Sequence, residues 1–261
     1  MKQVECIIMD WAGTAIDFGC FAPVEAFAKT FEEIEVPVST NEIRLPMGLA
    51  KKEHIRQLLQ MERVNKLFLE KQKREWNEED VDTLNKAFER HLFAQLSTYT
   101  TPIPNVIETL EDFKKENIKI GSTTGYTAKM MEIVRPAASH KGYNVDSCVT
   151  PDGFAAGRPA PYMIFQNMIN LDIRFLDRVV KVGDTIEDIK EGTRAKVWTV
   201  GVITGGSMLG LTEHEVNNTP REELKTKGES IKKEMLQAGA DFVINTIAEL
   251  PEIIESINSK L

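Results

Sequence analysis

Cysteine is scarce in this chain, and long apolar runs are absent. The three cysteines, Cys6, Cys20 and Cys148, are scattered and odd in number, which excludes a disulfide framework or a cysteine-rich zinc site and fits a reducing cytoplasm. No run approaches the roughly 20 apolar residues of a membrane span. The first apolar run ends at Asp10, too early for the core of a signal peptide. We therefore expect a cytoplasmic protein without a membrane partner.

Positive charge, glycine and proline are also in short supply. The chain has 32 Lys and Arg against 40 Asp and Glu, so it lacks the basic surface that nucleic-acid binding requires, and no nucleic-acid partner is expected. With 16 Gly and 11 Pro, collagen-like and low-complexity classes are excluded. Its 261 residues, 42% of them hydrophobic, suffice for one large domain or a core with an insertion.

What the chain does contain is a series of short apolar segments separated by helical patterns. The apolar segments are residues 4–9, 118–124, 145–149, 179–182, 197–203 and 241–244. The helical patterns between the later ones are residues 105–116, 128–140, 159–170 and 187–195. This alternation predicts an α/β fold with a Rossmann-like, doubly wound parallel sheet.

Residues 21–98 interrupt the alternation. Their apolar positions repeat at helical spacing, as in Ile55, Leu58 and Leu59, and they include no β-rich run. Pro102 and Pro104 favour a return linker after them. We predict a core domain of residues 1–20 and 99–261 and an inserted all-helical domain of residues 21–98. Residues 212–237 are predicted to be a peripheral helical stretch without chemistry.

Four motifs fall at strand ends, where open α/β sheets bind their ligands. They are Asp-Trp-Ala-Gly-Thr at residues 10–14, Ser-Thr-Thr-Gly-Tyr at 122–126, Gly-Arg-Pro at 157–159 and Gly-Asp-Thr-Ile-Glu-Asp at 183–188. In this order they resemble the haloacid dehalogenase superfamily, and the resemblance covers the whole core.

The residue types suit phosphoryl transfer. Asp10 can attack phosphorus and form an aspartyl-phosphate. Asp184 and Asp188 would crowd it, so a phosphorylated site requires cations, and we predict Mg²⁺ together with Arg158. Thr124 and nearby backbone N–H groups would bond the phosphate.

One departure changes the expected reaction. Phosphatases of the superfamily place a second aspartate, the general acid, two residues after the nucleophile, where this chain has Ala12. Lys51 and His54 share a face of a predicted helix. A lysine can form an imine with an aldehyde, which lets a carbon–phosphorus bond break without protonation of an alkoxide. Because an ordinary lysine is protonated at pH 7, this use requires a lowered pKa; Lys52 is the competing candidate.

These motifs, with Phe-Gly-Cys-Phe-Ala-Pro at residues 18–23 and Pro-Met-Gly-Leu at 46–49, resemble the phosphonoacetaldehyde hydrolase (phosphonatase) family over nearly the whole chain. The resemblance implies hydrolysis of phosphonoacetaldehyde to acetaldehyde and phosphate, in 2-aminoethylphosphonate degradation. It also implies a helical cap that closes over the core, and a homodimer formed through the caps.

The resemblance further implies a role for each site residue. Asp10 is the implied nucleophile, Lys51 the Schiff-base former and His54 its catalytic neighbour. The implied magnesium contacts are Asp10, the Ala12 carbonyl and Asp184, with Asp188 in support. The implied substrate contacts are Thr124, Gly125 and Arg158 for the phosphate and Cys20, Met47 and Tyr126 for the remainder.

Two other functions stay open at this point. The four core motifs also fit an ordinary phosphatase or phosphomutase, and Ala12 also fits a binding module that has lost catalysis. The residues do not identify the base for hydrolysis of the aspartyl-phosphate.

Overall fold

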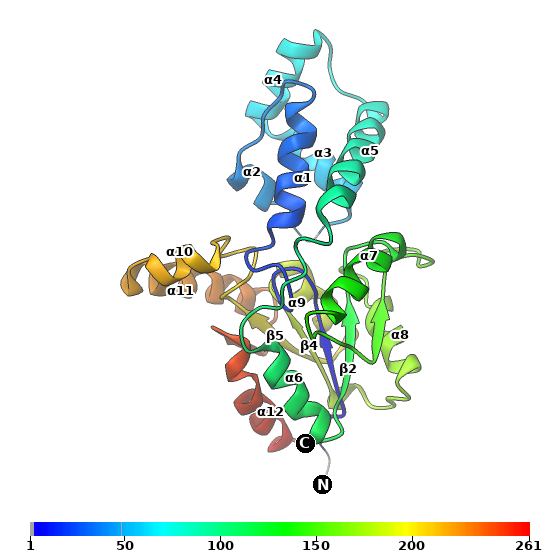
Figure 1. Cartoon of the computed structure of the whole chain (residues 1–261), viewed down its shortest axis with the longest axis vertical. Helices are drawn as coiled ribbons and strands as arrows, with labels where there is room; N and C mark the ends of the chain where they lie inside the picture. The colour runs from blue at the N-terminus through cyan, green and yellow to red at the C-terminus, as the bar shows by residue number, and fades with distance from the viewer. Residues whose placement is uncertain (1–2, 48) are drawn as a thin grey trace.

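A parallel sheet lies at the centre of the core. The computed structural model describes residues 3–47 and 49–261; Gly48, part of the Pro-Met-Gly-Leu motif, lies outside them. Within the described residues the strands form one six-stranded sheet in the order β3-β2-β1-β4-β5-β6 (Figure 1). The strands are β1 (Cys6–Met9), β2 (Lys119–Thr123), β3 (Ser147–Val149), β4 (Val179–Gly183), β5 (Trp198–Val202) and β6 (Phe242–Ile244). Every predicted apolar segment coincides with a strand, although β4 extends one residue beyond segment 179–182, and the predicted fold class is confirmed.

The register of the sheet positions the four motifs. β1 pairs in parallel with β2 and β4, and Ile7 lies opposite both Ile120 and Val180. β1 and β4 are buried along their whole length, as strands covered on both faces must be. Because neighbouring strands are parallel, their carboxyl ends share one edge. The residues that follow β1, β2 and β4 therefore converge.

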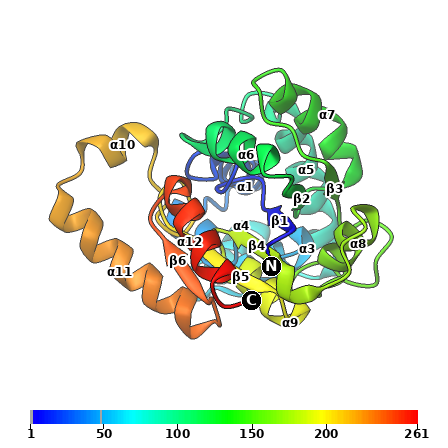
Figure 2. The ribbon, with the colours of Figure 1, turned by 90° about the horizontal axis from the view of Figure 1, so that it is seen from below.

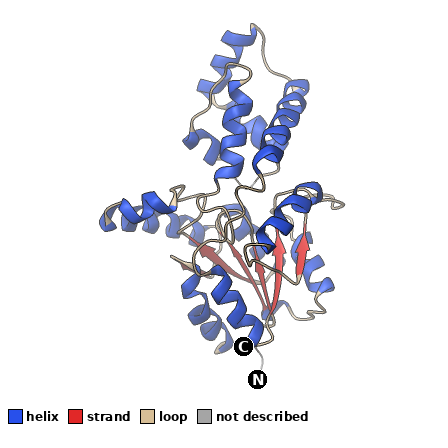
Figure 3. Ribbon diagram, viewed as in Figure 1, coloured by secondary structure: helices blue, strands red, loops and turns tan. Residues whose placement is uncertain are grey.

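Helices cover both faces of the sheet (Figures 2 and 3). α8 and α9 contact each other and the central strands, while α6 packs on β2 and on the turn before α12. The core helices are α6 (Val106–Lys115), α7 (Ala128–Ser139), α8 (Tyr162–Asn170), α9 (Ile186–Ala195), α10 (Glu213–Asn218), α11 (Arg221–Gln237) and α12 (Leu250–Asn258). α8 begins at Tyr162 and not at Pro159 as predicted, because the prolines at 159 and 161 disfavour helical backbone before them.

The segment predicted to be helical forms a group of helices beyond the carboxyl edge of the sheet (Figure 1). α1 contacts α2 and α5, and α3 contacts α4 and α5. The rings of Phe27 and Phe88 stack at the centre of the group, with centroids 4.2 Å apart. Its members are α1 (Phe21–Glu32), α2 (Thr40–Arg44), α3 (Lys51–Gln60), α4 (Glu62–Gln72) and α5 (Glu78–Gln95). We call this group the helical insertion.

Two linkers join the helical insertion to the core. The outgoing linker has positive φ at Asp17 (55°), Gly19 (84°) and Cys20 (56°). The N–H of Asp17 donates to the carbonyl of Thr101 in the return linker, at 3.2 Å. The two linkers therefore lie side by side at the carboxyl edge of the sheet. Among the described residues, no helix has the length and apolar character needed to cross a membrane.

Candidate active site

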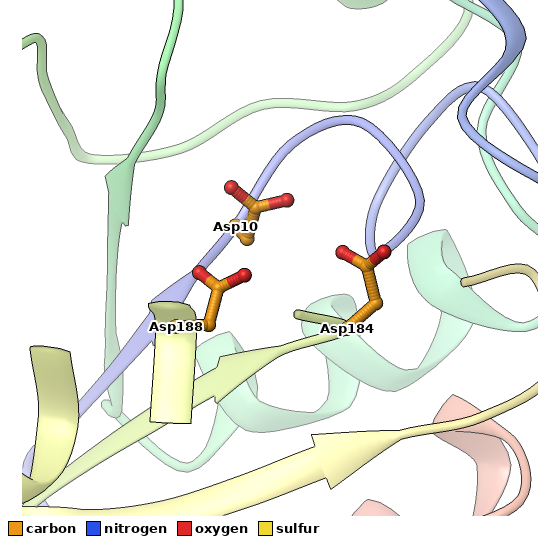
Figure 4. Close-up of side chains that lie close together, drawn as sticks. All are labelled: Asp10, Asp184 and Asp188. Carbon is orange, nitrogen blue, oxygen red and sulfur yellow. The ribbon is translucent and has the colours of Figure 1, made fainter. Parts of the chain in front are cut away.

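Three carboxyl groups meet where β1 and β4 end (Figure 4). Asp10 follows β1, Asp184 follows β4, and Asp188 lies in the first turn of α9. One oxygen from each lies within 4.8 Å of the others, and all three residues are buried. Gly13 permits this approach, because a Cβ there would lie 2.5 Å from Oδ2 of Asp184. The strand-end carboxylates that the sequence predicts are thus brought together.

Two buried cations face these carboxylates. Nη1 of Arg158 lies 2.7 Å from Oδ1 of Asp10 and 2.9 Å from Oδ1 of Asp188. Nζ of Lys181, which has no exposed surface, lies 2.8 Å from the same oxygen of Asp188. Burial alone would raise the pKa of Asp188, but Arg158 and Lys181 lower it below its usual range. Asp188 is therefore held as an anion.

The cluster fits a divalent cation. Asp10, Asp184, Asp188 and the buried Glu191 supply four carboxyl groups against two cations, Arg158 and Lys181. Burial is the largest cause that raises the pKa of Asp184 to about 7, and the charges of Asp10 and Asp188 add to it. A cation bound nearby would favour the ionised form of this carboxyl. Buried carboxylate oxygens are the donors that hard divalent cations prefer. The donor set therefore suits a divalent metal ion.

Asp184 is fixed by two hydrogen bonds. The Thr14 hydroxyl donates to Oδ1 at 2.9 Å, and the Ser207 N–H donates to Oδ2 at 2.7 Å. Each oxygen keeps a lone pair for another partner. Hydrogen bonds of this kind orient a carboxylate for a further partner such as a metal ion.

The residues after β2 form a second wall of the site. Thr124 is buried, and its Oγ1 accepts a hydrogen bond from the N–H of Tyr126 at 3.0 Å. Gly125 between them is exposed. Burial raises the pKa of Tyr126 well above its ordinary value, with Asp17, Cys20 and Asp10 adding to the effect. Tyr126 is therefore a neutral hydroxyl close to the charges of the site.

Lys51, the first residue of α3, places an amine near this cluster. Its Nζ lies 5.8 Å and 5.7 Å from the ring centroids of Phe27 and Phe88, and it has no hydrogen bond or ion pair with the described residues. Burial lowers the pKa of Lys51; the charges of Cys20 and Asp10 oppose this, and that of Arg158 adds to it. The amine is thus desolvated and within electrostatic reach of Asp10.

Lys52 has a different environment. Its Nζ lies 2.6 Å from Asp82 in an exposed ion pair, with about half of each side chain accessible. The amine of Lys52 is thus directed to the surface and engaged by a carboxylate there. The geometry thus favours Lys51 over Lys52.

His54 lies one turn after Lys51 and is fully buried. Its ring stacks on Phe27, with centroids 4.0 Å apart. Burial lowers the pKa of His54 well below its usual value, Lys51 lowers it further, and a polar contact with the backbone of Ile43 opposes the shift. The imidazole is therefore neutral and lies beside the amine.

Two further predicted contacts lie on the insertion side. Cys20 is buried at the start of α1, where burial raises the pKa of its thiol well above the ordinary value; Asp17, Asp184 and Asp10 add to this, and Lys51 opposes it. Met47 is partly buried and lines a cavity of about 930 Å³ with Ser207 and Thr185. Ala12 forms an isolated backbone bridge with Ile16 and brings no acid to the site.

Sequence reasoning missed several polar residues that support the site. Lys181 and Arg158 both bond Oγ1 of Thr123, at 3.0 Å and 2.6 Å, and Arg158 also bonds Glu191 at 3.0 Å. One signal was available, since a lysine inside the valine-rich segment 179–182 implies a buried charge that requires anionic partners. Glu191 gave no comparable signal, because a glutamate in a helix usually faces solvent.

Comparison with known proteins places the chain in a family. The haloacid dehalogenase-like hydrolase family matches residues 4–196. A phosphonoacetaldehyde hydrolase of Parabacteroides distasonis is 56% identical over 261 residues, covering 100% of this chain and 99% of that protein. A bifunctional phosphonoacetaldehyde hydrolase/aminoethylphosphonate transaminase of Clostridioides difficile is 46% identical, covering 99% of this chain and 41% of that protein. The crystal structure of a phosphonoacetaldehyde hydrolase-like protein from Oleispira antarctica has a TM-score of 0.96 at 34% identity, covering 99% of this chain and 94% of that one.

The parallel sheet, the clustered strand-end carboxylates and the family match together define a haloacid dehalogenase-like hydrolase. Full-length identity narrows the class, and the chain belongs to the phosphonoacetaldehyde hydrolase family. The resemblance that the motifs indicated is thus confirmed.

Proposed function

We propose that this chain hydrolyses the carbon–phosphorus bond of phosphonoacetaldehyde to give acetaldehyde and phosphate. The observation that carries the proposal is the presence of two groups in one site. Lys51 is a desolvated amine with no ion pair among the described residues, and the strand-end carboxylate Asp10 lacks the neighbouring acid of a phosphatase, since Ala12 stands in its place. The names of the relatives support the same substrate.

The amine begins the reaction in this proposal. Neutral Lys51 adds to the aldehyde carbon, and loss of water with uptake of one proton at nitrogen leaves a protonated imine. The protonated imine draws electrons from the adjacent carbon while an oxygen of Asp10 attacks phosphorus. The carbon–phosphorus bond breaks, its electron pair stays with carbon as an enamine, and the phosphoryl group remains on Asp10. Because the leaving group is an enamine carbon and not an alkoxide, the reaction needs no general acid at the position of Ala12.

Release completes the turnover. Protonation of the enamine carbon and hydrolysis of the imine free acetaldehyde and Lys51. Water then cleaves the aspartyl-phosphate to phosphate and Asp10. His54, neutral and one helical turn from Lys51, is assigned to proton transfer at the amine, and Cys20, Met47 and Tyr126 to the walls around the aldehyde.

The phosphoryl end requires positive charge. We assign Thr124, the Gly125 N–H and Arg158 to the phosphoryl oxygens. Asp10, the Ala12 carbonyl and Asp184 would hold Mg²⁺, with Asp188 supporting them. When bound, the cation supplies charge neutralisation to the carboxylates and the phosphoryl oxygens. The buried carboxyls, which outnumber the buried cations, support this assignment.

Three wider assignments belong to the same proposal. The helical insertion (residues 21–98) acts as a cap domain that closes on the core, and two copies associate through their caps. The bifunctional relative, whose name includes an aminoethylphosphonate transaminase, supports a place in 2-aminoethylphosphonate degradation, where a transaminase would supply the aldehyde. The low cysteine content supports a cytoplasmic location.

One assay tests substrate and mechanism together. Purified protein with Mg²⁺ and phosphonoacetaldehyde is expected to release acetaldehyde and phosphate in equal amounts. Borohydride added during turnover is expected to trap an adduct, which peptide mass mapping places at Lys51. Folded protein that gives neither product nor adduct would overturn the proposal. Hydrolysis of phosphomonoesters in its place would identify an ordinary phosphatase.

A further inference from the structure

A glycine-rich loop separates the helical insertion from Asp184. This loop, residues 204–211, contains Gly205, Gly206 and Gly210. A Cβ on Gly206 would lie 2.9 Å from Cβ of Asp184. The next residue, Ser207, donates its N–H to Oδ2 of Asp184 at 2.7 Å. The loop thus contacts Asp184, one of the proposed metal ligands, and fixes its carboxyl group by a hydrogen bond.

Arg44, the last residue of α2, reaches the same loop from the insertion. Its Nη1 donates to the carbonyl of Ser207 at 3.1 Å and to that of Gly19 at 2.8 Å. The guanidinium lies 4.9 Å from the centroid of the Phe21 ring. A Cβ on Gly210 would come within 2.8 Å of Nε, so the loop is shaped around this side chain.

The outgoing linker contacts both the loop and Arg44 through Gly19. The N–H of Gly19 donates to the carbonyl of Gly205 at 2.7 Å, while the carbonyl of Gly19 accepts from Arg44. One guanidinium therefore connects the insertion, the linker and the loop. Arg44, Ser207 and Gly210 also line the cavity of about 930 Å³ between the insertion and the core, so these contacts form part of its wall.

We propose that Arg44 is a positioning residue that couples the placement of the helical insertion to the metal-binding geometry of Asp184. This inference rests on the proposed metal site. When the insertion is docked, Arg44 holds the carbonyl side of Ser207, and the N–H side of Ser207 holds Asp184. When the insertion moves away, the loop loses this support and Asp184 loses its preset orientation.

A metal-binding experiment separates this role from simple electrostatics. Arg44 is a cation near Asp184, so removal of its charge alone should tighten the binding of another cation. Positioning predicts the opposite, because loss of a residue that orients a ligand typically weakens metal binding by about 10- to 100-fold. The probe is Mn²⁺, titrated without substrate and followed by the electron paramagnetic resonance signal of the free ion.

Three variants complete the test. Arg44→Met and Arg44→Lys are both expected to weaken Mn²⁺ binding by about tenfold. Lysine keeps the charge, but its shorter side chain ends before the position of Nη1, the one nitrogen that donates to both carbonyls. Arg63→Met removes an arginine elsewhere in the insertion, where it bonds Glu42 and Pro37, and is expected to bind Mn²⁺ as the unmodified protein does.

Two results would overturn the inference. Unchanged or tighter Mn²⁺ binding by folded Arg44 variants would refute the coupling but not the proposed metal site. Failure of the unmodified protein to bind Mn²⁺ would refute both the metal site and the coupling. Borohydride trapping at Lys51 reports on the imine mechanism separately, so these failures are distinguishable from a failure of the proposed reaction.

Discussion

Two adjacent lysines at the start of α3 differ in environment and therefore in expected chemistry. Lys51 is desolvated and unpaired among the described residues, and burial lowers its pKa; Lys52 is exposed and paired with Asp82. We expect Lys51→Met to reduce carbon–phosphorus cleavage at least about a thousand-fold, because the reaction loses its covalent step. The measurement is the rate of acetaldehyde release at saturating aldehyde.

Lys52→Met is the matched control, since it removes the same side chain one residue away. Loss of one exposed ion pair is expected to change stability by no more than about 1 kcal/mol and to leave trapping at Lys51 intact. Equal loss of activity in both variants would argue that α3, and not the amine of Lys51, is what the reaction requires.

The buried cation Lys181 is expected to be essential for stability. It lies 2.8 Å from Asp188 and 3.0 Å from Oγ1 of Thr123, with no exposed surface. Lys181→Met leaves Asp188 and Glu191 with less compensation, and removal of one partner from a buried ion pair typically costs about 3–5 kcal/mol. Urea denaturation measures this as a fall in the free energy of unfolding.

Lys190→Met is the comparison for that variant. Lys190 pairs with Glu187 at 2.8 Å on the partly exposed face of α9, so its loss is expected to cost about 0–1 kcal/mol. A small effect of Lys181→Met would mean that the buried carboxyls are protonated and do not require the cation.

Residue roles were predictable from sequence to different degrees. Asp10, Asp184 and Arg158 could be located because each lies in a motif at a strand end. Thr123 and Glu191 could not, because their roles depend on bonds to Arg158 across 35 and 33 positions. Such partners are determined by how the elements pack, and an individual side chain carries no local signal of them.

At the scale of elements, the buried side chain of Asp17 accepts hydrogen bonds from the first residues of α1, the first helix of the insertion. Oδ1 and Oδ2 of Asp17 accept from the N–H groups of Phe21 and Ala22, each at 3.0 Å. Burial raises the pKa of Asp17 to about 7, although these two bonds and Arg44 oppose the shift. The carboxyl group that binds the start of α1 therefore gains or loses its proton near neutral pH.

This raised pKa makes stability depend on pH with a definite sign. Between about pH 4 and 7 the unfolded chain has lost the Asp17 proton while the folded chain retains it, so stability falls as pH rises, by up to about 1.4 kcal/mol per pH unit. Asp17→Asn removes this titration and suits the positive φ of 55°. We expect the variant to lose less stability than the unmodified protein across this range.

Denaturant unfolding at pH 4.5, 5.5, 6.5 and 7.5 measures the difference. Parallel curves for the two proteins would show that Asp17 is ionised throughout and that its two N–H donors outweigh burial. Asp112→Asn, at an exposed aspartate paired with Lys115, controls for the replacement of a carboxylate by an amide elsewhere in the core.

Element boundaries were predicted closely where apolar periodicity was strong. Residues 128–140 predicted α7 (Ala128–Ser139), and residues 118–124 predicted β2 (Lys119–Thr123). The capping role of Asp17 was not predicted, because a linker aspartate with positive φ resembles an ordinary turn residue until its acceptors are seen.

The whole molecule combines a sheet whose class was predictable with an arrangement that was not. Alternating apolar and helical segments are sufficient to predict a parallel sheet. The strand order β3-β2-β1-β4-β5-β6 depends on the direction in which each connection crosses the sheet, which local patterns do not encode. The docking of the helical insertion on the linkers is likewise tertiary, since it runs through contacts such as that between Arg44 and Ser207.

Metal binding is expected to couple to the stability of the whole core. A cation that binds only the folded state stabilises it by about 2.7 kcal/mol when present at 100 times its dissociation constant. We therefore expect Mg²⁺ or Mn²⁺ to raise the midpoint of thermal unfolding, and EDTA to reverse the effect.

Asp184→Asn provides a stricter test, because the difference in stability between this variant and the unmodified protein should change sign when metal is added. Without metal the variant is expected to be the more stable protein, since it removes one of the crowded buried carboxyls, and its amide can still accept from Ser207 and donate to Thr14. With saturating metal the order should reverse, because the variant has lost a charged ligand. A variant that is less stable under both conditions would mean that Asp184 stabilises the fold through its hydrogen bonds to Thr14 and Ser207. It would also mean that the negative charge of the cluster is compensated without a metal ion.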